Sequence, residues 1–350
     1  MINHLVLKQF RNHNALDLVI NSNLVAITGP NAIGKTNILE AIYISSLTKS
    51  FKNSDNKLVE HNKDFFTIDR TDDNITTHIR FVQTDNSRTK LLKIKNSPQP
   101  LYSLIGRNPI TLFEPNDLYL LTGLPSLRRN YLDKILSQVD KTYLQNLRAY
   151  KKILHHRNSL LRRAKKEPVS NLNDQLFVLN IQLIKPGIYI SKARAGFIKE
   201  LQKSLNKYYK LISGGTKNIL VEFMNCASSN EDLLAKIEAA YHADKSCGFS
   251  TVGPHKEDFV VTMNGYNLSD SASRGELRSL VLACKLAELD YIEKSLERRP
   301  ILLLDDVLSE LDNTRQKFLL NNLSRQQTFI TTTHLPDNLT LDFQHIELPL

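Results

Sequence analysis

The spacing of hydrophobic residues predicts β-strands near both ends of the chain. Residues Asn23–Thr28 (NLVAIT) form a short apolar run typical of a buried strand, and Ile301–Leu304 form another. The β-rich segment Thr328–Thr333 predicts a further strand, and Thr76–Ile94 contains stretches suited to an antiparallel hairpin. We therefore expect a sheet-forming portion at each end of the sequence.

The middle of the chain has the pattern of long helices. From about Leu124, apolar residues recur at three- to four-residue spacing over Asn130–Arg163 and Asp174–Leu211, with Lys, Arg and Gln between them. Pro168 marks a break between the two stretches, and Ser213–Gly215 ends the second. These features predict an antiparallel helical arm inserted into an α/β head.

The predicted elements divide the chain into three parts. Residues 1–123 are expected to form the N-terminal lobe of the head, residues 124–248 the helical arm or lid, and residues 249–350 the C-terminal lobe. A chain of 350 residues is long enough for two domains. The fold class is therefore predicted as α/β with an inserted helical domain.

The first candidate site follows the first buried strand. It reads Gly29-Pro30-Asn31-Ala32-Ile33-Gly34-Lys35-Thr36, fits the pattern G-x-x-x-x-G-K-[ST] at every fixed position, and is followed by a helix-like stretch from Asn37. The glycines let the backbone approach phosphates, and the helix start supplies partial positive charge. Lys35 would reach the β- and γ-phosphates of ATP, and the Thr36 hydroxyl would bind Mg²⁺. The alternative is a chance glycine turn before a helix.

The second candidate site is an acidic pair after the second apolar strand. Asp305 has the position of a Walker-B aspartate, which holds Mg²⁺ directly or through water. Asp306 would lie beside the γ-phosphate, where a carboxylate orients or deprotonates the attacking water. By itself the pair is more simply a solvated strand end, but the phosphate loop favours the catalytic interpretation. The two motifs lie 265 positions apart (301 − 36), so the site closes only when the chain's ends fold together.

A histidine follows the last predicted strand. His334 would hydrogen-bond the γ-phosphate and report whether it is present. With Asp306 and Lys35 it makes up the predicted catalytic set. Taken alone, His334 is more simply an ordinary surface or capping residue.

A Ser/Gly turn, Ser273-Arg274-Gly275-Glu276-Leu277-Arg278, leads into another helix. A helix N-terminus of this kind is a second anion site. Because the chain already has a phosphate loop, we expect a head-to-tail homodimer, with ATP between the Lys35 loop of one protomer and Ser273 and Gly275 of the other. The alternative is a plain helix cap with Glu276 in a capping box, and both interpretations can hold together.

The charge of the chain favours a polyanionic partner. Its 46 basic and 36 acidic residues give a net charge of +10. The segments Arg148–Arg157 and Arg162–Lys166 place a dense basic stretch on the first arm helix. Without a base-reading motif, that stretch predicts a sequence-independent contact with DNA, and the alternative is a solvated helix face.

Other features favour a cytoplasmic protein without membrane contact. No apolar run is long enough to cross a membrane, and the N-terminus lacks a basic-then-apolar signal segment. The three cysteines, Cys226, Cys247 and Cys284, have no metal-ligand spacing. They are most simply buried thiols in a reducing cytosol.

Taken in order, these motifs resemble those of a known family. An N-terminal phosphate loop, a degenerate ABC signature at Ser273–Arg278, a Walker-B strand, the D-loop-like Ser309–Asp312 and a terminal histidine resemble the SMC-like ABC ATPases of DNA repair. Four linking segments narrow this to a resemblance with the RecF family of recombination mediators: Met1–His13 with its Phe-Arg-Asn turn, Leu112–Leu118, Leu124–Asp133 and Ser250–Asp258. The resemblance runs over nearly the whole chain.

This resemblance implies an ABC-type, SMC-like P-loop ATPase head that uses ATP and Mg²⁺, with Arg11 among the nucleotide contacts. It implies a weak DNA-dependent ATPase that dimerises on ATP and hydrolyses it slowly to control binding of duplex DNA and gap junctions. The implied role is recombinational repair of single-strand gaps, in DNA replication and the SOS response, with RecO and RecR as partners in loading RecA. The alternative is an SMC-like or other ABC-type ATPase that acts on DNA outside this pathway.

Two segments depart from the family pattern. The signature reads SRGELR where S-x-G-Q-Q-R is usual, and His255-Lys256-Glu257-Asp258 replaces the commoner H-R-D-D. An acid such as Glu276 near a phosphate site weakens ATP binding between protomers unless a cation offsets it. Arg274 is the candidate for that cation.

Three other classes fit the chain less well. In a transporter-type ABC ATPase the signature lies much closer to the phosphate loop, whereas Ser273 lies 237 positions beyond Thr36 (273 − 36). A P-loop kinase of a small metabolite does not need the Ser273 turn or dimerisation. A structural DNA tether of the SMC type needs a longer coiled-coil arm.

Overall fold

The computed structural model describes residues 1–215, 217–323, 325–334 and 342–348, and it divides into two compact units. Residues 1–117 and 288–350 form the first unit, and residues 118–287 form the second. Residues 249–287, which the sequence analysis placed in the C-terminal lobe, thus belong to the same unit as the arm. Backbone pairing explains this grouping, because strand β10 (Asp258–Met263) pairs antiparallel with β9 (Ile219–Met224).

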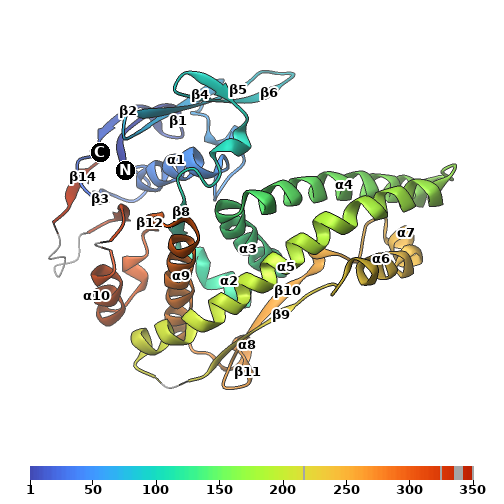
Figure 1. The fold of residues 1–350 in the computed structure, drawn as a ribbon. Helices are drawn as coiled ribbons and strands as arrows, with labels where there is room; N and C mark the ends of the chain where they lie inside the picture. The colour runs from blue at the N-terminus through green and yellow to red at the C-terminus, as the bar shows by residue number, and fades with distance from the viewer. Residues whose placement is uncertain (216, 324, 335–341, 349–350) are drawn as a thin grey trace. The chain divides into compact units, whose positions relative to one another are not determined.

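The first unit contains two β-sheets (Figure 1). One is antiparallel and has the strand order β2-β1-β4-β5-β6-β7. Its strands are β1 (Ile2–Phe10), β2 (His13–Val19), β4 (Phe65–Asp72), β5 (Ile75–Gln83), β6 (Arg88–Ile94) and β7 (Ser97–Gln99). The antiparallel pairing of β5 with β6 confirms the hairpin predicted over Thr76–Ile94.

The other sheet is parallel throughout, with the order β14-β3-β13-β12-β8. Its strands are β3 (Leu24–Thr28), β8 (Ile110–Phe113), β12 (Ile301–Asp305), β13 (Thr328–Thr332) and β14 (Gln344–Glu347). The predicted strands over Asn23–Thr28, Ile301–Leu304 and Thr328–Thr333 are confirmed apart from their end residues. Strands covered on both faces have unbroken apolar sequences, as β3, β8 and β12 nearly do. Since all five run in the same direction, the loops after β3, β12 and β13 lie at one edge of the sheet.

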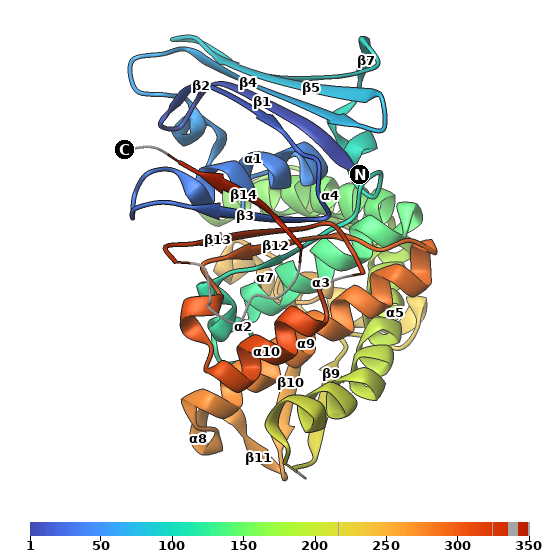
Figure 2. The same ribbon diagram turned by 90° about the vertical axis from the view of Figure 1, so that its left-hand side faces the viewer.

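Helix α1 (Lys35–Leu47) lies between the two sheets (Figure 2). A helix covered on both sides is apolar around its whole circumference. Accordingly Ile38, Leu39, Ile42 and Ile44 are all buried, and they join side chains of both sheets in one core. The helix begins at the Lys of the phosphate loop, two residues before the predicted start at Asn37.

The remaining elements of the first unit are short. They are the 3₁₀ helices η1 (Asp55–Leu58), η2 (Leu101–Leu104), η3 (Pro115–Leu118) and η5 (Leu308–Glu310), and helix α10 (Asn313–Asn321). The last residue of η3 belongs to the second unit. Helix α9 (Arg274–Leu296) begins in the second unit, and its last turns belong to the first.

The arm of the second unit consists of α3 (Pro125–Val139), α4 (Lys141–Lys166) and α5 (Leu172–Ser213). The prediction of one helix over Asn130–Arg163 is wrong, because α3 ends and α4 begins at Asp140. The Asp140 carboxylate accepts hydrogen bonds from the backbone N–H groups of Thr142 (2.8 Å) and Tyr143 (3.0 Å). An aspartate at this position stabilises the start of a new helix. The helix predicted over Asp174–Leu211 is confirmed as α5.

Beside the arm, the second unit has a small antiparallel sheet of order β11-β10-β9. Its other elements are α2 (Tyr119–Thr122), α6 (Asn230–Ala239), α7 (Tyr241–Cys247), η4 (Pro254–Lys256), β11 (Tyr266–Asn267) and α8 (Leu268–Ser271). Among the helices of the described residues, none is long and apolar enough to span a membrane.

Candidate nucleotide-binding site

The loop between β3 and α1 has the backbone geometry that its glycines require. The φ angle is +147° at Gly29 and +111° at Gly34, values that residues with a Cβ rarely adopt. Inside the loop, the Lys35 ammonium donates hydrogen bonds to the carbonyl oxygens of Gly29 (2.6 Å) and Pro30 (2.8 Å). Charged phosphate oxygens are stronger acceptors than these neutral carbonyls. The lysine is therefore placed to transfer its hydrogen bonds to a phosphate.

A turn between β1 and β2 holds this loop in place. The Asn12 amide donates to the Ile33 carbonyl (2.7 Å) and accepts from the Asn37 amide (2.6 Å). The His13 ring lies 3.2 Å from the Gly34 carbonyl, so its Nε2 must carry the proton that it donates. Burial lowers the pKa of His13, although this hydrogen bond opposes the shift. The sequence analysis gave Asn12 and His13 no site role, because neither is part of the phosphate-loop pattern.

Gly34 is required at its position for a second reason. A Cβ added there would lie 2.6 Å from the Asn12 amide and 2.7 Å from the His13 Nε2. The turn therefore packs directly against the backbone of the loop. A side chain at position 34 would therefore force the Asn12 and His13 side chains to move away from the loop.

Arg11, which the resemblance places among the nucleotide contacts, pairs with a buried carboxylate. Its Nε lies 3.0 Å from Oε2 of Glu40, and its second terminal nitrogen 3.3 Å from the other oxygen. Its remaining nitrogen donates to the Lys57 carbonyl (3.0 Å). The Ser50 hydroxyl also donates to Glu40, whose side chain is fully buried. A contact between Arg11 and the nucleotide stays a prediction.

The two ends of the chain meet at Asp305. Its Oδ1 accepts hydrogen bonds from the Thr36 hydroxyl (2.5 Å), at the start of α1, and from the Thr331 hydroxyl (3.0 Å) on β13. Its Oδ2 pairs with the Lys52 ammonium at 2.9 Å. Thr36 and Asp305 are the two predicted Mg²⁺ ligands, and the fold brings them together although they are 269 positions apart.

The donor set fits a magnesium ion bound together with a nucleotide. One hydroxyl and one carboxylate are oxygen ligands of the kind that Mg²⁺ prefers. Mg²⁺ bound by so few side chains takes its other ligands from phosphate and water. When bound, the ion would neutralise charge on the phosphates, and Thr36 and Asp305 would hold it at the mouth of the loop.

Asp306 has two unusual properties. Its φ angle of +53° lies in the left-handed region, and a non-glycine residue held there indicates a constraint. Its Oδ1 is buried and has no hydrogen-bond partner among the described residues, while its backbone N–H donates to Thr331. A buried carboxylate oxygen without a partner is costly and needs an explanation. A water molecule held for attack on a phosphate would supply the missing partner.

His334 follows β13, the strand between β3 and β12. Its side chain is exposed, and its backbone carbonyl accepts a hydrogen bond from the Thr332 hydroxyl (2.8 Å). The parallel register places it at the same edge of the sheet as the phosphate loop. Its role beside the γ-phosphate stays a prediction.

The signature turn lies in the second unit and has the geometry of a capping box. The Glu276 carboxylate accepts hydrogen bonds from the backbone N–H and the hydroxyl of Ser273, both at 2.9 Å, and the Ser273 hydroxyl accepts from the Glu276 N–H (3.3 Å). Lys217 forms an ion pair with Glu276, which together with the Ser273 bonds lowers the pKa of Glu276 to about 2. The cation that offsets the acid is therefore Lys217, and the prediction of Arg274 for this role is wrong. Binding of ATP by Ser273 and Gly275 stays a prediction.

Two of the family segments have structural roles inside the second unit. Arg128 forms a bidentate ion pair with Asp258, in which two guanidinium nitrogens each lie 2.7 Å from a carboxylate oxygen. Arg194 on α5 contacts Glu257 (3.0 Å) and the Pro254 carbonyl (2.6 Å). These segments hold α3, α5 and the η4 turn together.

The basic stretch on α4 is mostly exposed. Its exposed members are Arg148, Lys151, Lys152, His155, His156, Arg162, Arg163, Lys165 and Lys166. Arg157 is the exception, since it is 1% exposed and pairs with Asp244 at 2.6 Å. The stretch thus leaves one face of α4 rich in positive charge, and Arg157 belongs to the interior.

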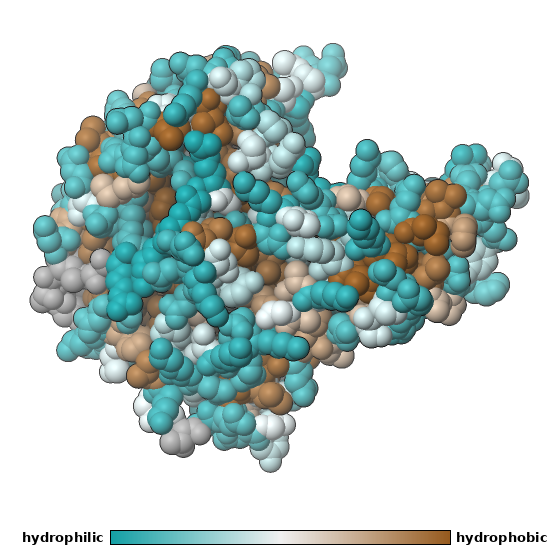
Figure 3. All heavy atoms as spheres, in the orientation of Figure 1, coloured by the Kyte–Doolittle hydropathy of each residue, from teal (hydrophilic) through white to brown (hydrophobic). Residues whose placement is uncertain are grey.

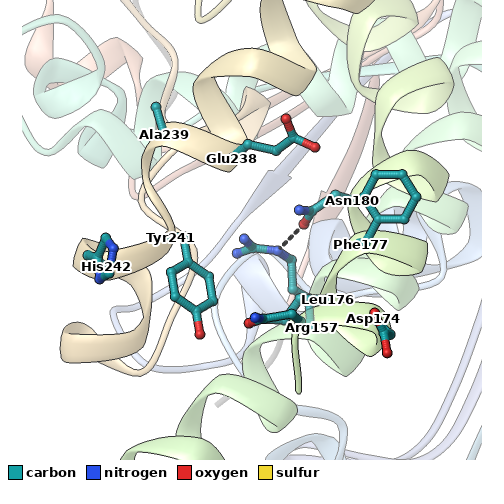
Figure 4. Close-up of a pocket in the computed structure, with 10 residues that line it drawn as sticks. Arg157, Asp174, Leu176, Phe177, Asn180, Glu238, Ala239, Tyr241 and His242 are labelled. Atoms are coloured by element: carbon teal, nitrogen blue, oxygen red, sulfur yellow. Dashed lines mark hydrogen bonds between the residues drawn. The ribbon is translucent and has the colours of Figure 1, made fainter. Parts of the chain in front are cut away.

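A cavity of about 610 Å³ lies between α5 and the α6–α7 region (Figure 4). Arg157 and Asn180 lie at its base and are joined by a 2.8 Å hydrogen bond, while Phe177 and Tyr241 contribute aromatic rings. Nearby, α5 exposes the apolar residues Val178 and Ile181. Figure 3 shows hydrophobic surface along the arm among hydrophilic side chains. The sequence analysis did not identify this cavity, because its lining residues come from helices that are far apart in the sequence.

The cysteines are free, and they differ in exposure. Cys284 is buried, Cys226 is partly buried, and Cys247 is exposed. The expectation that all three are buried is therefore wrong for Cys247, which lies at the end of α7. Burial raises the pKa of the Cys226 thiol, as does the neighbouring Glu257.

Comparisons with known proteins agree with this architecture. Residues 1–341 match the family model described as the RecF/RecN/SMC N terminal domain. The DNA replication and repair protein RecF of Acholeplasma laidlawii is 38% identical over 352 residues, covering 99% of this chain and 97% of that protein. The protein of the same name from Halalkalibacterium halodurans is 35% identical, covering 95% of this chain and 93% of that protein.

Solved structures give the same result. A structure described as the recombination mediator protein RecF-ATPrS in the RecFOR pathway superposes with a TM-score of 0.89 and 31% identity, covering 99% of this chain and 96% of that one. The corresponding RecF-ATP structure gives 0.87 and 31%, with 96% and 92% coverage. An SMC head bound to the C-winged helix domain of ScpA gives 0.54 at 14% identity, with 97% and 90% coverage, and so shares the fold.

Fold and site together define an ABC-type ATPase head of the SMC-like class. Within that class, this chain is 35–38% identical to the two RecF proteins described above, over nearly the full length of each. The chain belongs to the RecF family.

Proposed function

We propose that this protein binds ATP with Mg²⁺ at the β3–α1 loop, dimerises on it, and hydrolyses it slowly to control binding to DNA. The observation that carries the proposal is the 2.5 Å hydrogen bond between Thr36 and Asp305. It joins the phosphate loop to the Walker-B strand, so the two residues expected to hold Mg²⁺ lie side by side.

The chain's own residues would divide the work. Lys35 would move its hydrogen bonds from the loop carbonyls to the phosphates. Its positive charge would offset the negative charge of the phosphates, which otherwise repels an attacking water. Asp306 would orient that water through its unpartnered Oδ1 and accept its proton. His334 would approach the γ-phosphate from the end of β13.

Dimerisation would complete the site. The α9 N-terminus of one protomer, with Ser273 and Gly275, would face the phosphates bound at the Lys35 loop of the other. The Ser273 hydroxyl donates a hydrogen bond to the Glu276 carboxylate. That hydrogen bond must break before the hydroxyl can donate to a phosphate. Such a requirement supports a weak ATPase whose turnover depends on dimer formation, and we include stimulation by DNA in the proposal.

DNA is the proposed polyanionic partner. The exposed basic face of α4 and the net charge of +10 support a salt-dependent, sequence-independent contact with duplex and gap junctions. The names of the relatives support a role in DNA replication and repair, and the words RecFOR pathway in the descriptions of the solved structures support RecO and RecR as partners. We include RecA loading at single-strand gaps, the SOS response and a cytoplasmic location in this proposal.

The test is equilibrium binding of a fluorescent ATP analogue and of labelled gapped duplex DNA. Lys35→Ala should weaken analogue binding at least about a hundredfold and remove the effect of ATP on DNA affinity. Lys63→Ala, which removes an exposed lysine from the same unit, is the matched control and should change neither. Equal binding of the ATP analogue by wild type and Lys35→Ala would contradict the proposal. So would a wild-type affinity for DNA that is the same with and without ATP.

A further inference from the structure

Lys52 is the one cation that pairs with Asp305 among the described residues. Its ammonium lies 2.9 Å from Asp305 Oδ2, and the two side chains are 35% and 3% exposed. The other carboxylate oxygen accepts from the hydroxyls of Thr36 and Thr331. Every oxygen of this buried carboxylate is therefore occupied, and its negative charge is balanced by a lysine.

The position of Lys52 is fixed by its neighbours in sequence. The Ser50 hydroxyl oxygen accepts the backbone N–H groups of Lys52 (2.9 Å) and Asn53 (2.8 Å), and its proton goes to Glu40. The Phe51 ring packs edge-on against Tyr43 of α1, with the ring centres 5.2 Å apart. The segment after α1 is therefore anchored on both sides of Lys52, which directs this lysine toward Asp305.

A lysine in this position has a direct electrostatic consequence. A divalent cation at Asp305 needs the same carboxylate and would lie within a few ångströms of the ammonium. Like charges at that separation repel strongly in a partly buried site, where solvent screening is reduced. The ammonium and a metal ion therefore compete for Asp305.

We propose that Lys52 is a resident counter-ion of the magnesium site, which keeps Asp305 aligned in the metal-free protein and opposes binding of a divalent cation alone. Metal then occupies Asp305 only when the negative charge of a nucleotide offsets the repulsion and displaces Lys52 from Oδ2. Lys52 is a positioning residue in this scheme. The nucleotide part rests on the proposed function, whereas the competition between Lys52 and metal does not.

The test is binding of Mn²⁺ alone to the full chain, measured from the paramagnetic resonance signal of free Mn²⁺. Lys52→Gln should bind Mn²⁺ at least about tenfold more tightly than the wild type, because the repelling charge is gone. Lys52→Arg keeps the charge and should resemble the wild type. Lys49→Gln removes an exposed lysine three positions away and serves as the matched control. Adding Asp305→Asn to Lys52→Gln should abolish the gain, which locates the metal.

A wild-type measurement keeps the proposal testable if Lys52→Gln unfolds. Without nucleotide, Mn²⁺ should bind the wild type no more tightly than it binds Asp305→Asn, because the Lys52 ammonium keeps the ion from that carboxylate. Tight Mn²⁺ binding to the wild type without nucleotide would overturn the proposal, as would equal affinities of wild type and a folded Lys52→Gln. Failure of the wild type to bind any adenine nucleotide would instead refute the proposed function, and the metal-only comparison would still decide the role of Lys52.

Discussion

Replacing Arg194 with methionine should destabilise the second unit strongly. The Arg194 side chain is 3% exposed and contacts Asp133 (2.8 Å), Glu257 (3.0 Å), the Pro254 carbonyl (2.6 Å) and the Tyr143 hydroxyl (3.2 Å). Methionine has similar length and fills much of the space, so the main effect is electrostatic. Two carboxylates and a carbonyl would lose a buried cationic partner at once.

The magnitude follows from the burial. Breaking a buried ion pair by removing one partner costs about 3–5 kcal/mol, and no discount for solvent applies at 3% exposure. The second unit has 170 residues (287 − 118 + 1), for which each kcal/mol shifts Tm by roughly 2–4 °C. We therefore expect Arg194→Met to lower the Tm of this unit by about 6–20 °C (3 × 2 to 5 × 4).

Far-UV circular dichroism is the suitable assay, because the chain has no tryptophan. The matched control is Lys203→Met, which removes a cation paired with Glu200 on the same helix but 71% exposed. Exposed pairs contribute about 0–1 kcal/mol, so this variant should melt within a few degrees of the wild type. Equal melting of the Arg194 and Lys203 variants would refute the reasoning that the buried network holds the arm together.

The pH dependence gives a second check on the same variant. Burial raises the pKa of Asp133, but the charges of Arg194 and Lys151 outweigh it and hold that pKa below its usual value. In the wild type this carboxylate therefore contributes stability above its unfolded pKa, and the contribution is lost as pH falls through the folded pKa. In Arg194→Met, burial should raise the pKa of Asp133 above its unfolded value, so ionisation of this carboxylate destabilises the folded variant as pH rises. The difference in Tm between wild type and variant should therefore be smaller at pH 4 than at pH 7.

Three further outcomes follow from the site. Asp306→Asn should retain ATP binding and lower the hydrolysis rate by about 10²–10⁴-fold in a phosphate-release assay, and wild-type turnover would exclude Asp306 as the base. Gly34→Ala should lose most ATP-analogue binding, because its Cβ would lie 2.6 Å from Asn12 and φ is +111°. Normal binding would contradict the role of Asn12 and His13 in holding the phosphate loop. Glu276→Gln should tighten the ATP-dependent dimer several-fold in sedimentation experiments, because it removes a carboxylate that the Lys217 ion pair keeps negatively charged. A weaker dimer would show that the capping box matters more than this charge.

Sequence alone predicts the central strands β3 and β12 of the parallel sheet well, because they are buried along nearly their whole length. Unbroken apolar runs such as Ile301–Leu304 leave little choice of element, and the fixed residues of the phosphate loop then identify both halves of the site. The break in the arm at Asp140 was missed because hydrophobic periodicity continues through it. An aspartate followed by helical residues is a known start signal, and it would have located the boundary.

The supporting residues of the site could not be predicted in the same way. Tertiary folding brings Asn12 to the phosphate loop, Lys52 to Asp305 and Glu40 to Arg11, and nothing in their local sequence indicates those partners. The capping box at Ser273 was foreseen as an alternative, because S-x-x-E is a local rule. The pairing of Lys217 with Glu276 was not foreseen, because the two residues are 59 positions apart in the sequence.

The central claim is that ATP joins two heads through the Lys35 loop and the Ser273 turn. Light scattering of the purified 40.0 kDa chain, with and without ATP and Mg²⁺, tests it most directly. We expect the mass to double with nucleotide in the wild type, and to stay that of a monomer in Lys35→Ala and Ser273→Arg. A wild type that remains monomeric with nucleotide and gapped DNA together, or a Ser273→Arg variant that dimerises normally, would contradict the account.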